Sequence, residues 1–104
     1  SKDEVQVLFL KKNPKIISLV KEWNPSIHLI GFKLLVDVTK EHLIQIARES
    51  LVKNQADLIV ANDLTQINAD QHLAYLVEEK DYQIAASKQE IADLLVEKIQ
   101  GFDR

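Results

Sequence analysis

The sequence has no cysteine, only two glycines and two prolines, and few aromatic residues among its 104 positions. Without cysteine, disulfides, thiolate catalysis and sulfur-ligated metal sites are all excluded. Neither a glycine-rich phosphate-binding loop nor the glycine pattern of dinucleotide-binding folds occurs. No apolar run approaches the roughly 18 residues that a membrane-spanning helix requires, and the amino terminus lacks the layout of a signal peptide. We therefore expect one globular domain in the cytoplasm.

Neither acidic nor basic residues strongly predominate in the chain. The 13 basic and 16 acidic residues leave a net charge of −3, which gives no strongly basic face. A nucleic-acid partner and a membrane partner are therefore not expected, whereas a single nucleotide needs only a few local donors. The chain starts at Ser1 without methionine and enters a strand-like run almost at once, which suggests a piece of a longer protein.

Three short apolar runs have the length and composition of buried strands, over residues 5–10, 27–32 and 57–61. Helical patterns separate them, so the first half of the chain predicts parallel βαβ units covered by helices. A hairpin and a final helix follow, which gives the order β-α-β-α-β-β-β-α. The prediction is an α/β fold with a mostly parallel sheet and an antiparallel hairpin at one edge.

Cap and turn signals bound these elements. The first helix is predicted to start at Asn13-Pro14, the second to be capped by Asp37 or Thr39, the hairpin to join 73–77 to 82–85, and the last helix to run from the capping box of Ser87 and Glu90 to Gly101. Ligands of open α/β sheets bind beyond the carboxyl ends of the strands. The residues that follow the three apolar runs are therefore the candidate site.

The first of these junctions combines a helix start with Lys11, Lys12 and Lys15. The free backbone N–H groups of a helix start favour a phosphate, and the lysines add positive charge. A capped helix with its lysines in solvent explains the same residues. The sequence leaves both interpretations open.

The second and third junctions carry more specific side chains. Glycine within a strand often marks the close approach of a ligand, so at Gly31 a base could lie flat on Phe32 while Lys33 reaches a phosphate. Alternatively, Gly31 serves packing and Phe32 belongs to the core. Asn62 can read an amide or a hydroxyl group, but Asn62 and Asp63 can equally close a turn on their own backbone.

Other side chains give no catalytic pattern. The three histidines, His28, His42 and His72, lack the spacing of metal ligands, so no metal site is predicted. The serines lack the context of a nucleophile elbow, and no hydrolytic triad can be assembled.

Together, several segments resemble phosphopantothenate–cysteine ligases, in particular the C-terminal portion of the stand-alone bacterial enzymes. The matching segments are Lys12-Asn13-Pro14-x-Ile16, Ile30-Gly31-Phe32-Lys33-Leu34, Ala47-Arg48 and Ala56-Asp57-Leu58-Ile59-Val60-Ala61-Asn62-Asp63. The last of these is the most specific. The resemblance covers nearly the whole chain in the right order, so residues 1–104 would be the C-terminal portion of a single ligase domain.

The resemblance implies a ligase of coenzyme A biosynthesis with a Rossmann-like three-layer fold that works as a homodimer. In this family CTP or ATP, with Mg²⁺, activates the carboxylate of 4′-phosphopantothenate as an acyl-nucleotidylate, and the amino group of cysteine displaces the nucleoside monophosphate. The family's glycine-rich half and its lysine-rich loop would lie upstream of Ser1. The resemblance therefore implies no catalytic residue in this chain, which should be inactive alone.

Carried over residue by residue, the resemblance assigns roles to particular positions. Nucleotide contacts fall to Pro14, Lys15, Ile16, Ile17, Phe32 and Lys53; substrate-binding or structural roles fall to Lys33, Asn62 and Asp63; no residue is assigned to a metal. Relatives carry more lysines along the helix that holds Lys53, and many have Glu-Thr where this chain has Leu35-Val36. Lys33-Leu34 replaces an Ala-Ala pair of many bacterial relatives, so the choice between CTP and ATP stays open.

Two other function classes fit the same pattern. One is a non-catalytic nucleotide-binding or interaction module built on the same sheet. The other is a small flavodoxin-like or receiver-type regulator, but a receiver needs clustered acidic residues after an early strand. Here lysines follow residues 5–10 instead.

Overall fold

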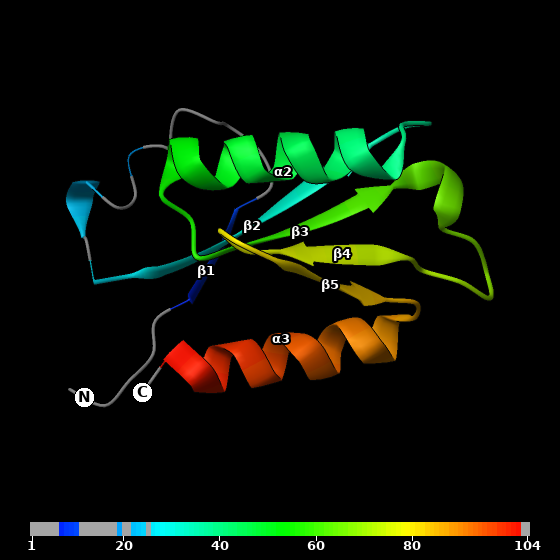
Figure 1. The fold of residues 1–104 in the computed structure, drawn as a ribbon. Helices are drawn as coiled ribbons and strands as arrows, with labels where there is room; N and C mark the ends of the chain where they lie inside the picture. Colours follow the sequence, from blue (N-terminus) through cyan, green and yellow to red (C-terminus); the bar gives the residue numbers. More distant parts are fainter. Residues whose placement is uncertain (1–6, 11–18, 20–21, 25, 103–104) are drawn as a thin grey trace.

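The structure, a computed structural model, describes residues 7–10, 19, 22–24 and 26–102. Among these residues a five-stranded sheet lies between two helices in three layers (Figure 1). In chain order the elements are β1 (Val7–Leu10), β2 (His28–Leu35), α2 (Lys40–Asn54), β3 (Leu58–Asp63), the short 3-10 helix η1 (Leu64–Gln66), β4 (Ala74–Val77), β5 (Tyr82–Ala85) and α3 (Lys88–Phe102). The start of the predicted first helix, at Asn13-Pro14, lies outside the described residues, whereas Leu19, Glu22 and Trp23 of the same segment are helical.

The five strands lie side by side in the order of the chain. β1, β2 and β3 run parallel, while β4 is antiparallel to β3 and β5 to β4. The predicted α/β fold with a parallel sheet and an antiparallel hairpin at one edge is therefore confirmed. The carboxyl ends of β2 and β3 lie on one side of the sheet (Figure 1), which we call the carboxyl edge.

Two strands extend further than the sequence predicts. β2 continues through Leu35 instead of ending at residue 32, and β3 continues through Asp63 instead of ending at residue 61. The reason is mutual pairing, because Leu34 lies opposite Asn62 and Leu35 lies opposite Asp63. A polar side chain does not end a strand whose backbone still finds a partner. Lys33, Asn62 and Asp63 are thus strand residues.

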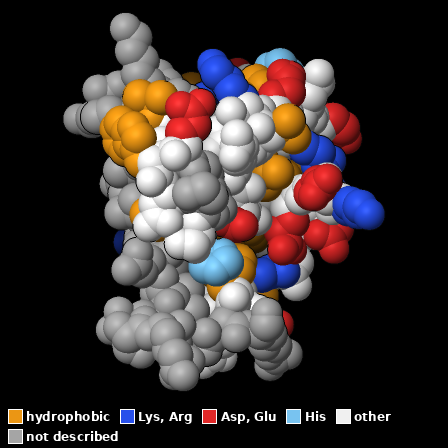
Figure 2. Space-filling view, turned by 90° about the vertical axis from the view of Figure 1, so that its left-hand side faces the viewer, with side chains coloured by type: hydrophobic (Ala, Val, Ile, Leu, Met, Phe, Trp, Pro, Cys, Tyr) orange, Lys and Arg blue, Asp and Glu red, His pale blue; other side chains and the backbone are white. Residues whose placement is uncertain are grey.

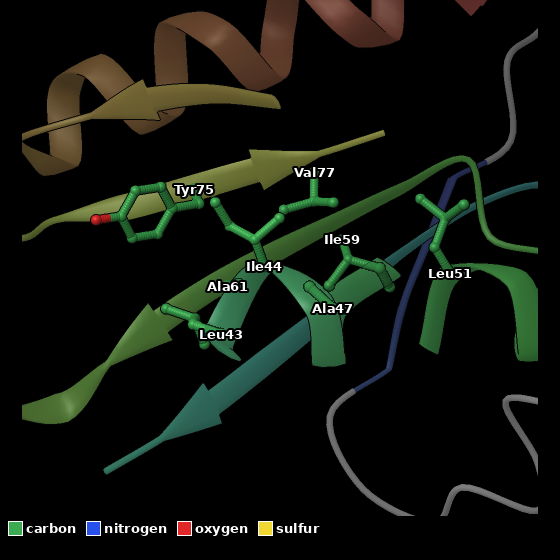
Figure 3. Packing of buried hydrophobic residues seen from close by; sticks show 8 residues of the cluster. All are labelled: Leu43, Ile44, Ala47, Leu51, Ile59, Ala61, Tyr75 and Val77. Atoms are coloured by element: carbon green, nitrogen blue, oxygen red, sulfur yellow. The ribbon is translucent and has the colours of Figure 1, made fainter. Parts of the chain in front are cut away.

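One face of the sheet packs against α2. The buried side chains of this cluster, seen in Figure 3, come from α2 and from the adjacent strands β3 and β4: Leu43, Ile44, Ala47, Leu51, Ile59, Ala61, Tyr75 and Val77. Thr39 is the cap of α2, since its side chain accepts a hydrogen bond from the His42 N–H at 3.1 Å. The alternative cap, Asp37, precedes it with a φ of 53°.

The other face of the sheet packs against α3. Its cluster joins buried strand residues, Ile30, Leu58, Val60, Ala74, Leu76 and Ala85, to half-buried side chains, Phe32, Ile91, Leu94, Leu95, Ile99 and Phe102. The Ser87 hydroxyl accepts from the Glu90 N–H at 3.1 Å, as the capping box predicts, and the helix includes Gly101 and ends at Phe102. α3 itself contributes no fully buried residue to this cluster.

Figure 2 views the molecule from the side opposite the carboxyl edge. Acidic and basic side chains are interspersed on the described part of this side. Within the residues that the structure describes, neither helix combines the length and the apolar character needed to cross a membrane.

Candidate functional site

The carboxyl edge of the sheet has two different surfaces, because side chains alternate along a strand. Val60 packs into the α3 cluster and Ala61 into the α2 cluster. By the same alternation, Asn62 belongs to the α3 side and Asp63 to the α2 side. On β2, Phe32 contacts the α3 cluster and Leu35 the α2 cluster, which places Lys33 on the α2 side. We call these the α3-side surface and the α2-side surface.

Asp63 dominates the α2-side surface. The residue is only 3% exposed, and its side chain accepts four hydrogen bonds. Its donors are the backbone N–H groups of Asp37, Val38 and Thr65 at 2.9, 3.0 and 2.9 Å, and the Thr65 hydroxyl at 2.7 Å. Asp63 therefore ties the connection between β2 and α2 to the end of β3.

The same hydrogen bonds keep the Asp63 carboxylate charged. Chiefly the Thr65 hydroxyl, and then the backbone donors of Thr65, Asp37 and Val38, lower the pKa of Asp63 from 3.8 to about 2, although burial acts in the opposite direction. The sequence left two roles open for Asp63, ligand binding and closing a turn on the local backbone. These hydrogen bonds support the second role. Thr65, which the sequence analysis missed, was readable as an Asp-x-Thr pattern, since an aspartate often bonds the backbone two residues on.

Asn62, on the α3-side surface, makes fewer hydrogen bonds than Asp63. Its side chain is half-buried, and its amide nitrogen Nδ2 donates to the backbone carbonyl of Leu73 at 2.9 Å. A carbonyl oxygen can only accept, so this bond fixes which arm of the amide is the nitrogen. Among the described residues, the carbonyl oxygen Oδ1 of Asn62 accepts no hydrogen bond.

Phe32 shares this surface with Asn62. Phe32 pairs with Val60 and Leu34 pairs with Asn62, so Phe32 and Asn62 are diagonal neighbours on adjacent strands. The Phe32 side chain is half-buried at the border of the α3 cluster, and Leu34 beside it is 57% exposed. The structure thus brings together two of the predicted site residues, next to the exposed apolar side chain of Leu34.

Lys33 and Gly31 lie on the opposite face of the sheet from Phe32. Consecutive strand residues point to opposite faces, so a ligand that lies on Phe32 does not meet Lys33 on the same surface. A Cβ added at Gly31 would lie 2.9 Å from Cδ1 of Ile59. This close approach supports the packing interpretation of Gly31.

Lys53 lies on the exposed surface of α2, across the sheet from Phe32. It lines a shallow hollow of about 480 Å³ together with Gln45, Arg48, Glu49 and Val52. Within one chain, Lys53 and Phe32 therefore belong to different surfaces. The guanidinium of Arg48 donates to the Glu78 and Asp81 carbonyls, both at 3.3 Å, which ties α2 to the hairpin turn.

The remaining predicted positions are Pro14, Lys15, Ile16 and Ile17, which lie outside the described residues. Their nucleotide contacts stay a prediction. Within the described part of the chain, no three side chains of the metal-binding types come together. Both oxygens of the Asp63 carboxylate already accept hydrogen bonds from backbone and hydroxyl donors, so Asp63 is not assigned as a ligand of the Mg²⁺ that the resemblance implies, and this Mg²⁺ stays a prediction.

Comparison with known proteins decides the family. The model of the DNA/pantothenate metabolism flavoprotein C-terminal domain matches residues 1–102. The chain belongs to this family. A solved structure of the family, the DNA/pantothenate metabolism flavoprotein from Streptococcus pneumoniae, is 71% identical with a TM-score of 0.85 and covers 99% of this chain. The resemblance found in the sequence is confirmed at the level of the family.

Two curated relatives, each named coenzyme A biosynthesis bifunctional protein CoaBC, are also similar. The one from Thermococcus kodakarensis is 39% identical over 71 residues, which are 68% of this chain and 18% of the relative. The one from Methanocaldococcus jannaschii is 32% identical over 103 residues, 96% of this chain and 26% of the relative. The chain also spans only 47% of the Streptococcus pneumoniae structure, so family members carry substantial sequence beyond the part matched here.

Proposed function

We propose that the chain is the C-terminal portion of a phosphopantothenate–cysteine ligase domain and acts in coenzyme A biosynthesis. The reaction would join 4′-phosphopantothenate to cysteine through an acyl-nucleotidylate, with CTP or ATP as co-substrate and Mg²⁺ accompanying the nucleotide. Family membership and the names of the curated relatives support the pathway. The observation that carries the site is the pairing of β2 with β3, which makes Phe32 and Asn62 neighbours at the carboxyl edge.

In this proposal the chain positions the nucleotide and does not perform the bond-forming steps. Phe32 offers a half-buried aromatic ring for the base, and Asn62 offers a polar group beside it. Asp63 holds the adjoining β2–α2 connection in place from the other surface. Such positioning lowers the barrier because the reacting groups arrive already oriented.

Other parts of the proposal depend on residues that the structure does not describe or on other chains. Pro14, Lys15, Ile16 and Ile17 would contact the nucleotide at a helix start, where backbone N–H groups favour phosphate. Lys53, on the outer surface of α2, would reach a phosphate only at a surface other than that of Phe32. The lysine that holds the activated intermediate would come from sequence upstream of Ser1, and the active form would be a cytoplasmic homodimer.

The decisive experiment is a turnover assay on the full-length protein that contains this chain. With 4′-phosphopantothenate, cysteine, Mg²⁺ and either CTP or ATP, we expect release of CMP or AMP and formation of the amide product. Omitting 4′-phosphopantothenate is the control and should abolish the release. Absence of release with all substrates present would refute the ligase, and nucleotide binding without release would favour a non-catalytic nucleotide-binding module.

A further inference from the structure

The last turn of α3 makes an aromatic contact with the start of β2. Figure 1 shows that α3 ends on the side of the sheet where β2 begins. There the ring of Phe102 stacks on the ring of His28, with 4.5 Å between the ring centroids and 8° between the ring planes. Gly101 directly precedes Phe102, and a Cβ added to it would meet nothing within 4 Å. Gly101 thus adds no packing and, as a glycine inside a helix, weakens this turn, which depends strongly on Phe102 to stay docked.

His28 is the partner in this stack that can change its charge. Its Nδ1 is buried, makes no hydrogen bond with the described residues, and lies 3.8 Å from Oδ2 of Asp57. A neutral ring without a proton on Nδ1 leaves a lone pair near that carboxylate oxygen. A protonated ring instead brings a positive charge to the carboxylate and to the face of Phe102, and both of these contacts are attractive.

Other charged groups near the stack do not change their charge in the same pH range. Val7, the residue of β1 that pairs with His28, is uncharged. On α3, in the turn before the stack, the ammonium group of Lys98 pairs with the Glu78 carboxylate. The aspartate and arginine at 103–104 lie outside the described residues. Acidic side chains, lysine and arginine ordinarily keep their charge between about pH 5.5 and 7.5, whereas histidine titrates there.

We propose that His28 and Phe102 form a pH-sensitive latch for the C-terminal end of α3. Protonation of His28 tightens the stack and holds the last turn on the sheet, whereas the neutral ring lets this turn open more often. Because the protonated ring gains the face of Phe102 only in the docked state, the latch is tight near about pH 5.5 and loosens as the pH rises through neutrality. Opening uncovers the end of the α3 cluster, to which Phe102 belongs. The latch does not depend on the proposed ligase activity.

Amide hydrogen exchange of the full-length protein, followed by NMR at pH 5.5 and pH 7.5, measures how often this turn opens. After correction for the intrinsic exchange rate at each pH, the amides of residues 99–102 should be about two- to fivefold more protected at pH 5.5. The amides of the last turn of α2, residues 51–54, are the internal reference and should keep the same protection. Equal protection of residues 99–102 at both pH values would overturn the inference, as would an equal change in both turns.

Variants assign the pH dependence to the stack. His28→Phe keeps an aromatic ring for the stack but cannot take up a proton, so residues 99–102 should be equally protected at both pH values. Should this variant fail to fold, Phe102→Leu keeps the histidine, removes the ring face and should lose the pH dependence likewise. The matched control is His42→Gln, which removes an exposed histidine from the first turn of α2 and should behave as the wild type. A pH dependence that persists without His28 or without the Phe102 ring, or that disappears in the control, would contradict the latch.

Discussion

Asn62 and Asp63 are consecutive residues at the end of β3, and they show how differently the two surfaces of the carboxyl edge are built. Asp63 is buried, accepts four hydrogen bonds and holds the β2–α2 connection. Asn62 is half-buried, makes one hydrogen bond and keeps an acceptor available among the described residues. Asp63 thus closes the α2-side surface, whereas the α3-side surface stays open and is the one that we propose meets the nucleotide.

Removing Asp63 should break the closed surface and have the largest effect on stability. Asp63→Ala leaves the N–H groups of Asp37, Val38 and Thr65 without their acceptor, and unpaired buried donors are costly. We expect the midpoint of thermal unfolding to fall by roughly 10 °C or more in a domain of this size, measured by calorimetry. Asn62→Ala is the control from the open surface and should cost much less. Equal losses for the two variants would remove the contrast.

Acid should weaken the closed surface through the same carboxylate. Because the pKa of Asp63 is about 2 in the folded protein against an ordinary 3.8, its ionised form stabilises the fold above about pH 4, and this contribution is lost as the pH falls toward 2. In urea unfolding, the stability difference between wild type and Asp63→Asn should be constant from pH 7 to about pH 4 and should shrink below it. A difference that stays constant down to pH 2 would argue against a lowered pKa.

On the open surface, Phe32→Ala should affect binding more than stability. Loss of a ring that stacks on a base should weaken nucleotide binding to the full-length protein by roughly 1–3 kcal/mol, measured by calorimetric titration. Phe102→Ala is a matched control, since Phe102 is a half-buried aromatic residue of the same α3 cluster that stacks on His28 at 4.5 Å. If both variants bind nucleotide like the wild type, Phe32 is a core residue only.

The smallest effect is expected at Gly31, which lies beneath the closed surface. In Gly31→Ala the new methyl group meets only the end of the Ile59 side chain, which can shift. We expect a loss of unfolding free energy of about 1 kcal/mol or less and an unchanged nucleotide affinity. An affinity loss of about tenfold with unchanged stability would instead support the close approach of a ligand to Gly31.

The order of the elements could be predicted because its signals are local. Apolar runs, the cap at Thr39 and the capping box at Ser87 each depend on a few neighbouring residues, and the structure has all of them. The ends of β2 and β3 could not be predicted in this way. Leu34 and Asn62 stay in their strands because they pair with each other, and no local pattern reveals that pairing.

The sequence named candidate residues for the site but did not show that they lie on two opposite faces of the sheet. From the sequence we expected Phe32 and Lys33 to contact the same ligand. We also expected Asn62 and Asp63 to share one role, either ligand contact or closing a turn. Both pairs are consecutive residues of strands, so alternation separates them onto opposite surfaces. Assigning the surfaces required the true strand ends and the packing of Val60 and Ala61, which only the fold provides.

The most direct test of the account is a nucleotide titration of the ¹⁵N-labelled full-length protein followed by NMR. With the nucleotide that binds best, the side-chain amide signal of Asn62 and the backbone signal of Phe32 should shift, while the backbone signals of Asp37 and Val38, held by Asp63, should stay in place. Shifts confined to Asp37 and Val38, with Asn62 and Phe32 unchanged, would place the ligand on the other surface and contradict the account.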